Sequence, residues 1–115
     1  MSDQAQSSNW LPIDEIARRV NKGSLKAVDL VELSLKMIDE KKQYNAVIGI
    51  MEDRAKSRAV EIDSKVKNGE QAGRLAGVPF IAKDNFLTFG GETTAGSNIL
   101  RGFEAPYQST AIEML

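Results

Sequence analysis

The chain has 115 residues, 42% hydrophobic and 27% charged, which is enough for one modest domain or a piece of one. Its 15 lysines and arginines nearly balance 16 aspartates and glutamates, so no strong basic field exists to hold nucleic acid. Cysteine and histidine are absent, which excludes disulfides, thiolate zinc sites and any mechanism within this chain that needs imidazole. We expect a cytoplasmic protein without a membrane span, because no apolar stretch approaches the ~20 residues that a spanning helix needs.

The N-terminal third predicts a leader and two helices. Residues 1–9 are mostly polar and lack the basic and apolar segments of a signal peptide, so we expect a disordered leader over residues 1–10. A helix follows around residues 13–20, and Gly23 is suited to end it. A second helix is predicted from Ser24 to Lys42. Its apolar residues cover more than one stripe, which indicates burial on two sides or within a larger body.

The middle of the chain predicts a third helix between two strands. The apolar run Asn45–Met51 is typical of a strand, as is Val78–Ala82. Glu52–Lys67 carries a narrow apolar stripe, with acidic residues at its start and lysines at its end, and Asn68-Gly69 should terminate it. Helices that alternate with apolar strands indicate an α/β fold.

The last residues predict the beginning of another helix. Thr110 and Glu113 have the spacing of a capping box, and an apolar helical pattern starts at residue 111. A helix of this length is too short to be stable alone, since ~12–15 residues are needed even for good helix formers. We therefore interpret the sequence as truncated.

A Lys-Asp-Asn triplet, residues 83–85, follows the second predicted strand. In α/β sheets, ligands bind at the carboxyl ends of strands, and desolvation there would lower the pKa of Lys83 and make it a possible base. The alternative is an ordinary surface lysine paired with Asp84. Ser97, in the Gly/Thr-rich stretch that follows, is a conceivable nucleophile, but no nucleophile elbow surrounds it and the stretch lacks the spacing of a phosphate-binding loop.

The block Leu75–Asn85, read as LAGVPFIAKDN, resembles the segment that opens the active site of amidase-signature enzymes. The resemblance covers nearly all of the chain after residue 10. Two further elements, Thr93-Thr94 and Ala105–Thr110, are similar to the A-type subunits of tRNA-dependent glutamyl-tRNA(Gln) amidotransferases. The resemblance implies that residues 11–115 are the N-terminal part of an amidase domain, truncated before its serine-containing signature. It also implies the α/β fold of that family, in which helices pack on a partial mixed sheet.

In that family amides are hydrolysed by a Ser-cisSer-Lys triad, and the resemblance assigns the lysine to Lys83. The Gly/Ser-rich signature that supplies the serines has no counterpart before Leu115, so we expect the chain alone to be inactive. The released ammonia would serve to convert Glu-tRNA(Gln) to Gln-tRNA(Gln). The implied partners are B- and C-type subunits, with tRNA reached through the complex. The resemblance implies no cofactor or metal in this chain, and ATP and Mg on a partner subunit.

The start of the second helix departs from the family pattern. The family often has Ser there and a Glu three residues later, whereas Lys26 and Asp29 stand here, so we expect Ser24 to provide the cap. The alternative function is a non-catalytic interaction or complementing module that uses the same fold, or self-associates through surfaces that a further domain would cover.

Overall fold

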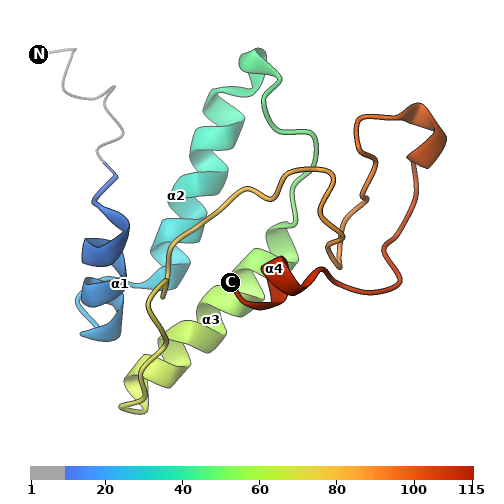
Figure 1. Cartoon of the computed structure of the whole chain (residues 1–115). Helices are drawn as coiled ribbons and strands as arrows, with labels where there is room; N and C mark the ends of the chain where they lie inside the picture. The colour runs from blue at the N-terminus through green and yellow to red at the C-terminus, as the bar shows by residue number, and fades with distance from the viewer. Residues whose placement is uncertain (1–9) are drawn as a thin grey trace, which may run out of the picture.

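The computed structural model describes residues 10–115 (Figure 1). Apart from Trp10, the predicted leader lies outside the described residues. The helical elements in chain order are α1 (Ile13–Asn21), α2 (Ala27–Glu40), the 3-10 turn η1 (Lys42–Tyr44), α3 (Glu52–Lys67), the 3-10 turn η2 (Asn98–Leu100) and α4 (Thr110–Glu113).

The ends of α1 and α3 confirm the predicted glycine stops. After α1, the amide of Gly23 donates to Val20 and that of Ser24 to Arg19. After α3, the amide of Gly69 makes the equivalent bond to Val66. Both glycines have a positive φ, which a residue without a Cβ adopts at little cost. The third helix matches its prediction residue for residue, whereas α2 is shorter than predicted at both ends.

The N-terminus of α2 is capped by a residue that sequence spacing did not indicate. The prediction that Ser24 caps it is wrong, because the Ser24 hydroxyl donates back to the carbonyl of Arg19. Instead, the carboxylate of Asp63 on α3 accepts the amide of Ala27 at 2.8 Å and that of Val28 at 3.2 Å. A carboxylate at this position satisfies two free amides and complements the positive end of the helix dipole.

The core lies where the three long helices meet the loop that follows α3. The gold trace in Figure 1 shows this loop crossing the helical layer. Ile16 and Val20 of α1 and Leu30 of α2 form the buried cluster together with Ala76 from the loop. Side chains from α3 and both flanking loops pack against it: Leu25, Ile62, Val66, Ala72 and Val78. Burial of these groups is the main stabilising contribution in this layer.

Two contacts fasten the loop to α1. The side-chain amide of Asn21 donates to the carbonyl of Gly73 at 2.9 Å, and its oxygen accepts the amide of Ala72 at 2.7 Å. Further along, Gly77 has φ +73°, and a Cβ placed there would lie 2.6 Å from Cγ2 of the fully buried Val20. Glycine at position 77 therefore lets the loop pack closer to Val20 than a residue with a Cβ could.

The two predicted strands are wrong for this structure. Residues 45–51 and 78–82 form neither strand nor helix, and the isolated antiparallel bridge Glu92–Glu104 is the one β-type pairing within residues 10–115. A strand is stabilised only when a neighbour pairs with its backbone, and among the described residues no backbone hydrogen bond joins these two segments. The α/β sheet is thus not formed, and the described chain is mostly helix and irregular loop.

The predicted capping box at α4 is also wrong. Ser109 occupies the N-cap position, Thr110 is already helical, and no side chain caps the turn. The helix starts at Thr110, one residue earlier than predicted, and has four residues. Across the described chain, the radius of gyration is 15.7 Å, compared with ~13 Å for a compact domain of about 100 residues, so the loops spread out rather than closing on the core.

Candidate functional site

An open groove of about 970 Å³ lies between the residues that join α2 to α3 and the loops after residue 80. One wall is formed by residues 46–51, and the other by residues 81–86 with parts of the loop 88–96. Lys83 lies on this second wall, and its side chain is exposed. Lys83 thus follows the apolar segment on the groove wall, but that segment is not the predicted strand, and the lysine side chain is exposed rather than desolvated.

Asp84, next to that lysine, is bound to a turn ten residues later. Its carboxylate accepts the amide of Thr94 at 3.0 Å and the amide of Gly96 at 3.4 Å, and the Thr94 hydroxyl donates to its second oxygen. These bonds, led by the Thr94 hydroxyl, hold the pKa of Asp84 below its usual range, although partial burial opposes them. The alternative in which Asp84 pairs with Lys83 is not found among the described residues.

Ser97, the conceivable nucleophile, has a structural role here. Its hydroxyl oxygen accepts the amide of Ile99 at 3.3 Å and so caps η2. A capping hydroxyl at the start of a short turn needs no catalytic explanation. The structure therefore provides no serine partner for Lys83 from this position.

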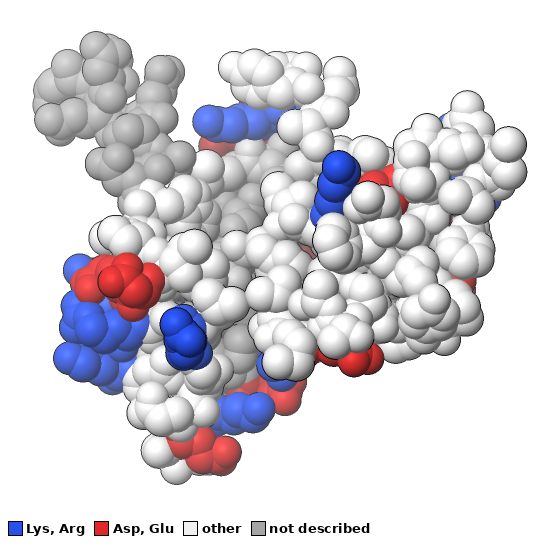
Figure 2. All heavy atoms as spheres, in the orientation of Figure 1, with Lys and Arg blue, Asp and Glu red and all other residues white. Residues whose placement is uncertain are grey.

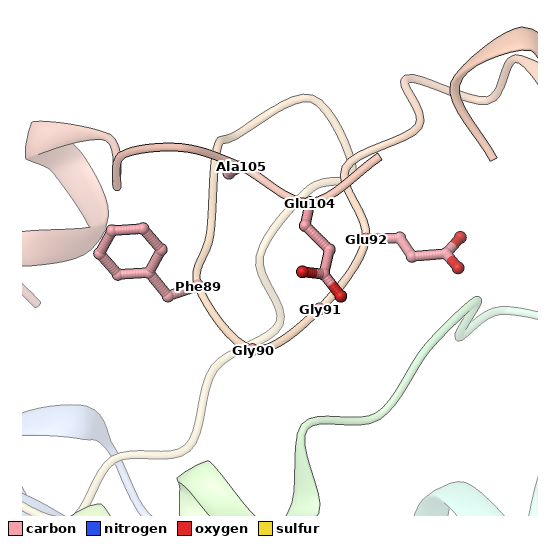
Figure 3. A pocket seen from close by; sticks show the side chains of 6 residues that line it. All are labelled: Phe89, Gly90, Gly91, Glu92, Glu104 and Ala105. Atoms are coloured by element: carbon pink, nitrogen blue, oxygen red, sulfur yellow. The ribbon is translucent and has the colours of Figure 1, made fainter. Parts of the chain in front are cut away.

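A second hollow of about 290 Å³ lies between residues 89–92 and residues 104–105 (Figure 3). Two carboxylates line it, but in Figure 3 the Glu104 side chain is directed toward Gly91 whereas Glu92 is directed away. No group of three or more residues capable of holding a metal ion occurs in the part of the chain that the structure describes.

Charged side chains gather over the helical part of the face shown in Figure 2, while the loop part is largely uncharged. Arg54 at the start of α3 connects the two parts. Its guanidinium donates to the carbonyl of Phe89 at 2.5 Å and to Oε1 of Gln108 at 2.6 Å. Gln108 also accepts the amide of Phe89, at 3.4 Å. The loops that form the groove are thus held to α3 by a small set of polar contacts.

The comparisons with known proteins agree on one family. The model of the Amidase family matches residues 29–115, which include the groove and Lys83. The chain belongs to the Amidase family. It is 38% identical over 105 residues to the A-type subunit of the mitochondrial glutamyl-tRNA(Gln) amidotransferase of Ornithorhynchus anatinus, covering 91% of this chain and 20% of that protein.

Other relatives carry the same description. The protein from Homo sapiens is 37% identical over 101 residues, 88% of this chain and 19% of that protein, and the one from Xenopus laevis is 38% identical over 91% of this chain and 20% of that protein. The chain thus spans about a fifth of the length of these relatives. No solved structure matches it significantly.

These matches confirm the resemblance inferred from residues 75–85. They give no support to a cytoplasmic location, because the names of the matched relatives place those proteins in mitochondria. None of the helices among residues 10–115 is long and apolar enough to cross a membrane. The sequence does not predict that Thr94 is the partner of Asp84. The resemblance identifies the Thr93-Thr94 pair only as similar to the A-type subunits, without linking it to Asp84.

Proposed function

We propose that this chain carries the general-base lysine of the A-type component of a glutamine-dependent amidotransferase, and that Lys83 is that residue. The observation that carries the proposal is the position of Lys83 on the wall of the groove, directly after the apolar segment of the family block. The identity of about 37% to A-type subunits over nine tenths of the chain supports this assignment.

The proposed chemistry is amide hydrolysis through an acyl-enzyme. Lys83, acting through a bridging serine, removes the proton from the serine nucleophile, and the serines come from a part of the protein beyond the described residues. A lysine can act as a base once neighbouring groups exclude water from its amine, because desolvation favours the neutral form. The exposed Lys83 of this structure acquires those neighbours only when further polypeptide covers the groove.

The rest of the reaction belongs to the complete protein. Ammonia released from glutamine passes to a B-type subunit, which amidates activated Glu-tRNA(Gln) using ATP and Mg, and a C-type subunit completes the complex. Segments 45–51 and 78–82 become strands of a mixed sheet when the remaining amidase polypeptide supplies their pairing partners. Lys83 is the one residue of this chain to which we assign a chemical role, and the described chain alone is inactive.

Two substitutions of Lys83 in the full-length protein that carries this segment test the proposal. Lys83→Ala should reduce glutaminase activity by the ~10²–10⁴-fold typical of a general base, measured as ammonia release. Lys83→Arg should fail as well, since the guanidinium stays protonated. A matched control is Lys22→Ala, which changes an exposed lysine of the α1–α2 connection. An active Lys83→Arg enzyme would refute the role of Lys83 as a base.

A second candidate, an interaction or complementing module, is favoured by the exposure of the groove's apolar side chains. Ile48 is 79% exposed and Ile81 72%, and both line the groove. Exposed apolar surface of this kind marks an interface or leads to association. The isolated chain should therefore bind a hydrophobic dye and sediment as more than a monomer, whereas a dye-free monomer with ammonia release in the full-length protein favours the enzyme role alone.

A further inference from the structure

The turn that follows Lys83 is held by hydrogen bonds from threonine side chains. The amide of Phe86 donates to the carbonyl of Lys83 at 3.0 Å, which closes the turn. The carbonyl of Phe86 then accepts two hydroxyls, from Thr88 at 3.0 Å and from Thr93 at 3.3 Å. These two threonines are the buried polar residues among residues 10–115. Because a buried hydroxyl is costly unless bonded, each of them specifies where the Phe86 carbonyl must lie.

The second attachment of this turn runs through Asp84 and a left-handed residue. The carbonyl of Asp84 accepts the amide of Ala95 at 2.8 Å, while its carboxylate accepts the flanking amides of Thr94 and Gly96. Three successive amides can converge on one residue because Ala95 has φ +49°. A residue with a Cβ is strained in this conformation and persists there only when its surroundings require it.

From this geometry we infer that Asp84 is a positioning residue for Lys83, holding the lysine's backbone against the 94–96 turn so that its side chain stays on the groove wall. The inference rests on the proposed function, since it assumes that Lys83 is the base. Asp84 does not contact reacting atoms in this account. Because the Lys83 side chain is exposed and flexible, its direction depends mainly on the position of the Lys83 backbone, which Asp84 helps to fix.

The chemistry of the contacts explains why the residue is an aspartate. All the groups directed at its side chain are donors: the Thr94 amide, the Thr94 hydroxyl and the Gly96 amide. A carboxylate accepts all three, whereas an asparagine would present an NH2 group to one of them. Asp84→Asn therefore keeps the size of the side chain but loosens the turn. Thr94→Val replaces the hydroxyl by a methyl group of similar size and so removes one donor to Asp84.

The size of the effect follows from the precision that proton transfer requires. A base must approach within hydrogen-bond reach, ~2.6–3.2 Å, of the proton that it removes. A displacement of about 1 Å at a catalytic group lowers the rate by about 10²-fold. We expect Asp84→Asn to lower kcat for glutamine hydrolysis by roughly ten- to a hundredfold with KM unchanged within about twofold, and Thr94→Ser, which keeps the hydroxyl, to retain the wild-type kcat.

The decisive experiment compares Asp84→Asn in two backgrounds of the full-length protein: with Lys83 present, and in Lys83→Ala. Residues that act as a unit lose activity non-additively, so a positioning role predicts that Asp84→Asn has no further effect on the residual activity once the lysine is removed. An equal loss of kcat in both backgrounds would make Asp84 merely structural, and no loss with Lys83 present would also refute the inference.

Two controls separate failure of the inference from failure of the proposed function. If Lys83→Ala itself keeps full activity, the proposed function is wrong whatever Asp84 does. If Lys83→Ala is inactive and Asp84→Asn is not, only the positioning role is wrong. Asp29→Asn, a substitution of the same type on α2, serves as the matched control and should leave kcat unchanged. Should Asp84→Asn fail to fold, Thr94→Val and Thr94→Ser provide the same comparison, with loss expected for valine only.

Discussion

Substitution of Gly77 by alanine tests the close approach between the LAGVP segment and α1. The new Cβ would lie 2.6 Å from Cγ2 and 3.3 Å from Cγ1 of Val20, which is 1% exposed and cannot move away into solvent. The substitution also places a Cβ on a residue with φ +73°. Two separate costs therefore act at one position, one from the backbone and one from packing.

The magnitude can be worked from these two costs. A left-handed conformation costs an L-residue roughly 1–2 kcal/mol, and overpacking a core costs typically ~1–3 kcal/mol. Alanine also reduces the conformational entropy of the unfolded chain relative to glycine, which stabilises the protein by about 0.4–1 kcal/mol. We expect Gly77→Ala to lower the free energy of unfolding by about 2–4 kcal/mol. With a urea dependence of ~1–2 kcal/mol per molar, that loss of stability moves the unfolding midpoint down by about 1–4 M.

The assay is urea unfolding followed by far-ultraviolet circular dichroism, at one low protein concentration for all variants. Gly69→Ala is the control, because Gly69 has φ +81° and nothing within 4 Å of its hypothetical Cβ. That variant bears the backbone cost alone and should be less destabilised by about 1–3 kcal/mol. Adding Val20→Ala to Gly77→Ala should relieve part of the clash, so the double variant loses less than the sum of the singles. Equal midpoints for Gly77→Ala and Gly69→Ala would refute the reasoning.

Three further predictions concern the helical layer and use unfolding or exchange measurements. Asp63→Ala removes the cap of α2 and should lower the free energy of unfolding by about 1 kcal/mol. Asp53→Ala should lower it less, since no side chain caps the start of α3, and equal losses would contradict the capping role of Asp63. Asn21→Ala releases the loop at residues 72–73 and should raise the amide exchange rate of Ala72, and an unchanged rate would show that the bond contributes nothing. Hydrogen bonds from Arg18 and Arg19 lower the pKa of Glu15 to about 2, so its stabilising contribution is present above the unfolded pKa of 4.5 and is lost as the pH falls toward 2. Glu15→Gln should flatten the pH dependence of stability between these values, and an unaltered profile would argue against the ion pairs.

The candidate site divides into a part that the sequence indicates and a part that it does not. The position of Lys83 after an apolar run could be anticipated because the Leu75–Asn85 block carries that order of residues. The partners of Asp84 could not, since Thr94 and Gly96 lie ten and twelve residues away and no local spacing links them to a carboxylate. Their short polar pattern, residues 93–96, is the one available signal, and by itself it predicts no more than a packed irregular loop.

Local sequence determined the helices of this protein. A helix pairs each amide with a carbonyl four residues away, so local sequence is sufficient to predict it. For α3 the signals are the apolar stripe of residues 52–67, the charges at its two ends and Gly69. For α1 the corresponding stop signal is Gly23. Only the tertiary structure decided the rest. A strand needs a neighbouring backbone, so the apolar segments 45–51 and 78–82 remain unpaired here despite their composition. The cap of α2 comes from Asp63, which is distant in sequence and reaches Ala27 only because α2 and α3 pack side by side.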